Sequence, residues 1–333
     1  MEKKSWTAAE LLQLSGGYWS ACALHAGVKL DVFSTLAEKA HTGAQLAGRL
    51  GTDERGLTML LNALAALELI EKHGESYGAT PFAAEFLSRQ SPQYLGHIIL
   101  HHHYLMPGWS RLDGAVRSGF PDRERTEKSF EPEQRESFEM GMFDLAMLIG
   151  PKVAAAIDLA GRRRLLDLGG GPGTYAVHFC LKNPELSAVD YDLPSTRPFA
   201  ERTIARFGLG NRITFCAGDF MTDDLPGRFD VAWLSHILHG CGPDACAVIL
   251  RKSASVLEPG GLIMVQEFIL DDTMDAPLHP ALFALNMLLG TPEGRSYSQG
   301  ELYAMLESAG ARNLRRIHLE LPNGAGVIAG NMP

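Results

Sequence analysis

The chain has 333 residues, of which 46% are hydrophobic and 21% are charged. These fractions are typical of soluble globular proteins, so they exclude a disordered or fibrous chain, and the length favours two domains. The formal net charge of -9 argues against the phosphate-neutralising surface that a nucleic-acid binder needs. We therefore expect no nucleic-acid partner.

The five cysteines are dispersed and form no C-x-x-C pair. This pattern predicts reduced thiols, with neither a disulfide framework nor a zinc site. No segment approaches the roughly 18 uninterrupted apolar residues of a membrane-spanning helix, and residues 1–7 lead into an amphipathic helix without the apolar core of a signal peptide. We expect a cytoplasmic protein with no membrane contact.

Residues 7–90 predict successive helices, because Leu, Val and Ala recur there at helical spacing and strand-like alternation is scarce. A helix from Thr42, a turn at 51–53 and a helix at 57–69 predict a helix-turn-helix. The following residues, 69–79, predict a short hairpin. This order of elements is typical of a winged helix.

A winged helix raises the possibility of a DNA-binding regulator. The segment 53–69, which would be its recognition helix, carries Arg55 as its only cation beside three acidic residues. The rest is mostly Leu, Ala, Met and Thr. Such a helix is better suited to protein packing than to phosphate contact.

Residues 91–160 continue as helices, and the pattern changes after Arg162 to short apolar runs that alternate with helices. That alternation is the signature of a parallel sheet covered by helices. A final hairpin predicts an antiparallel last strand. The fold class is therefore α/β, a doubly wound Rossmann-like sheet behind a mainly α-helical N-terminal domain. The predicted strands are residues 164–168, 186–191, 213–217, 229–234 and 262–268, and the hairpin is formed by 314–321 and 325–329.

A glycine-rich turn follows the first of these strands, where Asp167-Leu168-Gly169-Gly170-Gly171-Pro172-Gly173 precedes a helix. Glycines let the backbone turn tightly and approach a ligand closely. A dinucleotide fingerprint starting at Gly169 would need a glycine where Thr174 stands, which argues against a nicotinamide cofactor. No P-loop pattern is present.

Carboxylates follow the next two strands. The second strand ends in Val189-Asp190-Tyr191-Asp192-Leu193-Pro194, where a sheet of this topology holds ribose hydroxyls. The third ends in Gly218-Asp219-Phe220, which offers a carboxylate for an adenine amine and a ring to cover it. These positions favour a nucleoside cofactor.

In order and spacing, these motifs resemble the class I S-adenosylmethionine methyltransferases, and more narrowly the caffeic-acid and acetylserotonin O-methyltransferase family with its bacterial polyketide and pigment relatives. Residues 238–239, 257–267 and 294–298 also match, so the resemblance spans nearly the whole chain. It implies a homodimer acting on a small-molecule acceptor. It also implies a winged-helix-like dimerisation domain at 1–100, a helical linker and substrate-lining region at 101–160, and a cofactor-binding methyltransferase domain at 161–333.

The resemblance assigns a cofactor site for S-adenosylmethionine, with S-adenosylhomocysteine as product. The glycines would surround the methionine part, Asp192 rather than Asp190 would hold the ribose, and Asp219 would face the adenine. Asp167 would shape the glycine loop near the cofactor's amino end. The expected cofactor-binding residues are Asp167, Gly169, Gly171, Gly173, Asp192, Leu193, Asp219, Phe220 and Ser235.

His239 matches the family's general base, and a histidine that titrates near neutrality suits removal of a hydroxyl proton. Glu267 matches a carboxylate that orients this histidine. The plant-type pattern continues with Asp and Trp, whereas Gly240 and Cys241 follow here, and a second expected carboxylate falls near Ser296. A C-, N- or S-acceptor therefore stays open beside a hydroxyl, as does a ligand-sensing regulator with a degenerate methyltransferase domain.

A large flat hydrophobic acceptor is expected, because the candidate lining residues are mostly apolar and include several methionines. The run 101–103 is three histidines, but adjacent residues on a helix point in different directions, so we predict no metal site there or elsewhere. The expected substrate-binding residues are His102, Trp109, Met140, Phe143, Met147, Phe283, Asn286 and Met287.

Overall fold

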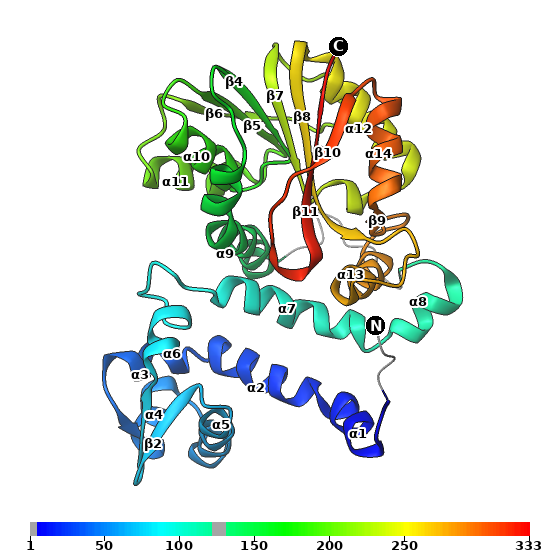
Figure 1. Cartoon of the computed structure of the whole chain (residues 1–333). Helices are drawn as coiled ribbons and strands as arrows, with labels where there is room; N and C mark the ends of the chain where they lie inside the picture. Colours follow the sequence, from blue (N-terminus) through cyan, green and yellow to red (C-terminus); the bar gives the residue numbers. More distant parts are fainter. Residues whose placement is uncertain (1–4, 122–130) are drawn as a thin grey trace. The chain divides into compact units, whose positions relative to one another are not determined.

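The computed structural model describes residues 5–121 and 131–333 (Figure 1). The chain divides into two compact units. The first contains Met1–Leu105 and Glu136–Asp144, and the second contains Met106–Arg135 and Leu145–Pro333. Among the described residues, no helix is both long and apolar enough to cross a membrane.

The first unit is a set of short helices around a three-stranded sheet of order β1-β3-β2. The Thr42 side chain caps α4 by accepting a hydrogen bond from the Gln45 N–H, Gly51 ends it at φ 65°, and Asp53 caps α5. The expected helix-turn-helix and hairpin are therefore present. The elements are α1 (Ala8–Gly16), α2 (Tyr18–Lys29), α3 (Val32–Glu38), β1 (His41–Thr42), α4 (Gly43–Leu50), α5 (Glu54–Ala66), β2 (Ile70–His73), β3 (Ser76–Ala79) and α6 (Pro81–Phe86).

Two longer helices, α7 (Gly96–Trp109) and α9 (Pro132–Ala156), contribute residues to both units. Within the first unit, the Asp144 carboxylate of α9 accepts hydrogen bonds from the His97 ring and the Ile98 N–H at the start of α7. Asp144 is buried, which raises the pKa of its carboxyl group, although these hydrogen bonds act in the opposite direction. The short helix α8 (Leu112–Ser118) follows α7 in the second unit.

The second unit is built on a mostly parallel sheet of order β10-β11-β8-β7-β4-β5-β6. Strands β4 to β8 pair in parallel, and β11 pairs antiparallel with both β8 and β10. The predicted fold class is confirmed. The strands are β4 (Arg164–Leu168), β5 (Ser187–Asp192), β6 (Ile213–Ala217), β7 (Phe229–Ser235), β8 (Leu257–Leu270), β10 (Arg312–Arg316) and β11 (Ala325–Asn331), and β9 (Tyr297–Ser298) pairs with the end of β8.

Successive residues of the central strands face opposite layers, so both faces of the sheet are apolar. Leu165 and Trp233 pack in the hydrophobic cluster that contains residues of α9, α10 (Thr174–Lys182) and α11 (Arg197–Arg206). Their neighbours Leu166 and Leu234 pack in the cluster that contains residues of α12 (Pro243–Ser255) and α14 (Gln299–Ser308). Figure 1 shows these helices on the two sides of the sheet.

The final hairpin differs from the expected one in the length of its first strand. The predicted strand 314–321 was wrong beyond Arg316, where β10 ends. The Ile317 N–H still donates to the Val327 carbonyl, but the Glu320 carbonyl accepts from Lys152 of α9 and not from a neighbouring strand. A local alternation of apolar residues does not show which partner each carbonyl will find.

Candidate active site

The glycine loop between β4 and α10 has the open backbone that its sequence predicts. Gly169, Gly171 and Gly173 adopt φ values of 64°, 58° and 71°, in the region that other residues rarely visit. A Cβ on Gly170 would collide with the Asp190 carboxylate, whereas the space beside Gly171 is open. The loop is therefore tight against the sheet on one side and free at Gly171.

The carboxylate of Asp192 joins the end of β5 to this loop. Its Oδ2 accepts from the Gly171 N–H at 2.8 Å and its Oδ1 from the Leu193 N–H at 2.7 Å. At the end of β6, Asp219 Oδ1 accepts from the Met221 N–H at 2.8 Å, which shapes the turn that follows. Both aspartates remain partly exposed at the carboxyl edge of the sheet, where folds of this kind bind ligands.

Asp167 is buried, with 1% of its surface exposed. Its Oδ2 accepts a hydrogen bond from the Ala176 N–H at 3.0 Å in the first turn of α10, so its contacts are those of a structural residue. Burial, assisted by the negative charge of Asp192, raises the pKa of Asp167 to about 7. The glycine backbone, the opening at Gly171 and the two partly exposed carboxylates fit a nucleoside cofactor. Of the remaining expected cofactor residues, Ser235 ends β7 and Phe220 packs partly buried against the cluster of α12 and α14.

His239 lies in a 3-10 turn, η2 (Leu238–Gly240), directly after β7, and Glu267 faces it from β8. Glu267 Oε1 accepts from the backbone N–H groups of Leu238 at 2.9 Å and His239 at 3.2 Å. Its Oε2 lies 2.7 Å from His239 Nδ1. Because both oxygens of this buried carboxylate are held, the ring orientation of His239 is fixed as well.

The Glu267 carboxylate is ionised. Burial by itself raises its pKa, but the charge of His239, the 2.7 Å hydrogen bond from its ring and the nearby His236 ring outweigh burial and hold the pKa below its usual range. An ionised partner at Nδ1 places the ring proton there and leaves a lone pair on Nε2. The pair is therefore arranged so that His239 Nε2 can accept a proton.

Sequence reasoning missed a group of side chains around this pair. His236 Nδ1 lies 3.6 Å from Glu267 Oε2, and its Nε2 lies 3.1 Å from the Gln266 side-chain nitrogen. The Phe268 ring lies 4.5 Å from the His236 ring and 4.8 Å from that of His279 on α13 (Leu278–Leu288), measured between centroids. The H-x-x-H spacing of the two histidines was the one signal available in the sequence.

A serine, Ser296, stands near the position where a second carboxylate was expected to orient His239. Ser296 is buried, and its hydroxyl donates to the Pro280 carbonyl at 2.7 Å. The backbone N–H of the preceding Arg295 donates to the His239 carbonyl at 2.8 Å. This segment therefore supports the His239 turn through its backbone, and Glu267 is the carboxylate that the described residues place against the ring.

The expected substrate residues are divided between the two units. Phe283 on α13 packs against His239, with ring centroids 4.8 Å apart in an edge-on arrangement. Asn286 lies on the same helix and is buried, and its Oδ1 has no hydrogen-bond partner among the described residues. The other assignments stay predictions: His102, Met140 and Phe143 lie in the first unit, and Trp109, Met147 and Met287 lie in the second.

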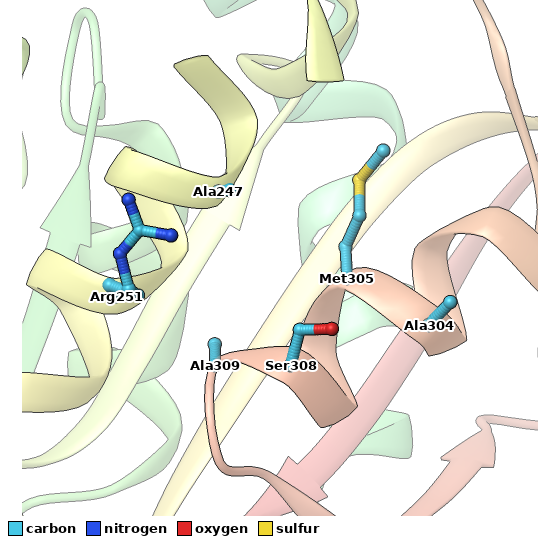
Figure 2. A pocket seen from close by; sticks show the side chains of 6 residues that line it. All are labelled: Ala247, Arg251, Ala304, Met305, Ser308 and Ala309. Carbon is cyan, nitrogen blue, oxygen red and sulfur yellow. The ribbon is translucent and has the colours of Figure 1, made fainter. Parts of the chain in front are cut away.

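Figure 2 shows a pocket lined by residues of α12 and of α14 with its C-cap in the second unit. It encloses about 180 Å3, which is below the usual range for cofactor sites. Arg251 and Ser308 are its only polar side chains, and both come from helices that cover the sheet. This pocket contains none of the expected site residues. Its lining residues are Ala247, Arg251, Ala304, Met305, Ser308 and Ala309.

Two family models match the chain. One describes an O-methyltransferase domain and matches residues 117–312. The other describes an O-methyltransferase dimerisation domain and matches residues 12–89. Together they span both units of the structure.

Relatives and solved structures agree with these matches. The chain is 35% identical to a 3-hydroxy-5-methyl-1-naphthoate 3-O-methyltransferase of Streptomyces sahachiroi, over 96% of this chain and 94% of that protein. It is 33% identical to a tetracenomycin polyketide synthesis 8-O-methyl transferase of Streptomyces glaucescens, over 96% and 95%. The structure of human N-acetylserotonin methyltransferase in complex with SAM superposes with a TM-score of 0.88 at 26% identity, over 100% of this chain and 99% of that one. The chain therefore belongs to the O-methyltransferase family and uses S-adenosylmethionine as its methyl donor.

Proposed function

We propose that this enzyme methylates a hydroxyl group of a small aromatic or polycyclic metabolite, with His239 as general base. The observation that carries the proposal is the buried, ionised Glu267 hydrogen-bonded to His239 at 2.7 Å beside the Phe283 ring. The relatives named above methylate a hydroxynaphthoate and a tetracenomycin polyketide by name, which supports a flat aromatic acceptor.

S-adenosylmethionine, when bound, supplies an electrophilic methyl group on a sulfonium centre. The glycine loop and the carboxylates of Asp192 and Asp219 would hold and orient the cofactor at the carboxyl edge of the sheet. His239 Nε2 would take the acceptor's hydroxyl proton, and the adjacent Glu267 charge would stabilise the imidazolium that results. The proton would then leave to solvent, since the His239 side chain is 15% exposed.

Aromatic side chains suit the expected acceptor. Phe283 contacts the rings of His239 and Phe268, each at 4.8 Å between centroids. Aromatic rings attract one another in edge-on and offset-stacked arrangements, so an aromatic acceptor could contact these rings in the same way. The buried Asn286 amide on the same helix would give the acceptor a polar contact that fixes its orientation.

We propose a homodimer because the first unit exposes large apolar side chains. Leu12 and Trp19 have 72% and 70% of their surface exposed, and α1 contains no buried residue. An apolar face of this kind needs a partner surface, and the dimerisation model covers it. The winged-helix role of residues 1–100, the lining role of 101–160, the cofactor domain at 161–333 and a cytoplasmic location stay predictions.

The first test is calorimetric titration with S-adenosylhomocysteine. We expect binding by the wild type and loss in Asp192→Ala, with the exposed Asp224→Ala as a matched control. Phenolic acceptors would then be screened with wild type and His239→Ala. Methylation that survives in His239→Ala would refute the base and favour a C-methyltransferase. Absence of cofactor binding by the wild type, with tight DNA binding at low salt, would favour the regulator.

A further inference from the structure

Three side chains with metal-binding atoms converge on the proposed base. One such atom from each of His236, His239 and Glu267 lies within 4.8 Å of the other two. From Oε2, the distances are 2.7 Å to His239 and 3.6 Å to His236. Bonds of about 2.0–2.1 Å to a tetrahedral Zn2+ place its donor atoms roughly 3.3 Å apart. Small side-chain movements would therefore bring these three atoms to coordination distance.

His236 is held toward this point although its Nδ1 makes no hydrogen bond to a described residue. Its backbone lies at φ 56°, a conformation that is uncommon outside glycine, and its N–H donates to the Gln266 carbonyl at 2.8 Å. Glu267 Oε1 keeps its two backbone donors, so Oε2 is already aimed at the gap between the histidines. The geometry thus presents one buried nitrogen that makes no hydrogen bond within the described residues and lies 3.6 Å from an oriented carboxylate.

Gln266 provides the outer support that a metal-bound histidine needs. Its side-chain nitrogen lies 3.1 Å from His236 Nε2 and 2.8 Å from the Tyr175 hydroxyl, and its Oε1 is buried with no partner in the described part of the chain. A half-turn of this amide would direct the oxygen toward both groups. It would then accept the His236 Nε2–H and the Tyr175 O–H, as outer partners of metal-binding histidines do.

We infer that His236, His239 and Glu267 form an inhibitory site for a divalent ion of the zinc type. Two imidazoles and one carboxylate are donors that such ions prefer, and the histidine side chains, 22% and 15% exposed, leave room for water as a fourth ligand. Each neutral imidazole gives its Nδ1 lone pair and carries its proton on Nε2, so no net proton is released.

The ion would switch off the base by fixing its tautomer. With its proton on Nε2, His239 has no lone pair there to accept the hydroxyl proton of the acceptor. The inhibition rests on the proposed function, whereas ion binding does not depend on it. The two parts can therefore be tested separately.

The test uses Co2+ as a coloured probe of the site. After chelator treatment, titration of the whole chain should give the visible absorption of about one tetrahedral Co2+ per chain, displaced by Zn2+. His236→Asn, which keeps a residue that tolerates positive φ, should weaken binding at least about 10-fold. The exposed His318→Asn is the matched control and should bind like the wild type. Calorimetry with S-adenosylhomocysteine checks that each variant is folded.

Methyl transfer gives the second readout. Zn2+ should inhibit the wild type, and His236→Asn should raise the half-inhibiting concentration by the same factor. Absence of a Co2+ band in the wild type, or a band that survives in His236→Asn, would overturn the inference. A chain that binds Co2+ through His236 yet methylates no acceptor supports the metal site and rejects the proposed function. A chain that methylates but binds no Co2+ rejects the metal site alone.

Discussion

Replacing Glu267 by glutamine tests the proposed base with almost no change in side-chain shape. In the wild type, Oε1 accepts two backbone N–H groups and Oε2 faces His239 Nδ1. The single oxygen of a glutamine would stay with the two backbone donors, so its amide N–H would face Nδ1. His239 would then carry its proton on Nε2 and could not accept one from a hydroxyl.

General-base catalysis contributes roughly 10²–10⁴-fold, so we expect kcat to fall by about 10³-fold, or about 4 kcal/mol of transition-state stabilisation. Cofactor affinity should not change, because, among the described residues, the glycine loop and the carboxylates of Asp192 and Asp219, which we propose to hold the cofactor, make no hydrogen bond to Glu267. The assay is transfer of a labelled methyl group to the best phenolic acceptor, with S-adenosylhomocysteine calorimetry in parallel. Glu258→Gln, on an exposed part of the same strand, is the control.

A Glu267→Gln rate within about threefold of the wild type, with cofactor binding intact, would refute the reasoning. Such a result would mean that the 2.7 Å contact with His239 does not set the working tautomer. Alignment of the acceptor by the surrounding aromatic rings would then account for the rate, as expected for a carbon acceptor.

Burial raises the pKa of Asp167 to about 7 in the folded state, so the wild type should lose up to about 4 kcal/mol of stability as pH rises from about 4 to about 7. Asp167→Asn should remove this loss, and urea unfolding at both ends of the range would show it; equal pH dependence in both proteins would contradict it. Gly170→Ala should cost about 1–3 kcal/mol of stability through collision with buried carboxylates. Gly171→Ala meets no atom of the described residues at its Cβ, so it should cost about 1 kcal/mol through its positive φ alone, and it should weaken cofactor binding more than Gly170→Ala does. Thermal melts and calorimetry separate the two, and the opposite ranking would refute this view of the loop. Leu12→Glu with Trp19→Glu should give monomers in light scattering, because both side chains are exposed in the single chain; a dimer of unchanged mass would place the interface elsewhere.

Local patterns predicted much of the fold. The strand Arg164–Leu168 and the strand Ile213–Ala217 have the bounds that their apolar runs indicated. For the central strand Arg164–Leu168 the reason is that a buried parallel strand is apolar on both faces. The helix-turn-helix followed from the caps at Thr42 and Asp53, whose side chains bond to backbone a few residues away. Such signals can be read from the sequence because each capping side chain and the backbone group that it binds lie only a few residues apart.

The site was readable only in part. The glycine loop follows its strand directly, so the strand end located it, and His239 was identified by its match to the family's general base. The contacts of His236 with Gln266 and Glu267 cross from β7 to β8, over sequence separations of 30 and 31 residues. No single-strand pattern carries that information, because strand pairing and register decide which side chains meet.

By itself, the sequence determined the fold class, because this depends on glycines, caps and apolar alternation that act over short stretches of chain. The order and spacing of its motifs carried the resemblance that indicated the family and, through the family, the cofactor. Only the tertiary structure decided that Asp167 of β4 is buried against the first turn of α10 and that Glu267 lies between two histidines. It also decided that β10 stops at Arg316, where Lys152 takes a carbonyl that a strand would have paired. Burial and long-range hydrogen bonding set pKa values and tautomers, and both arise only once distant segments pack together.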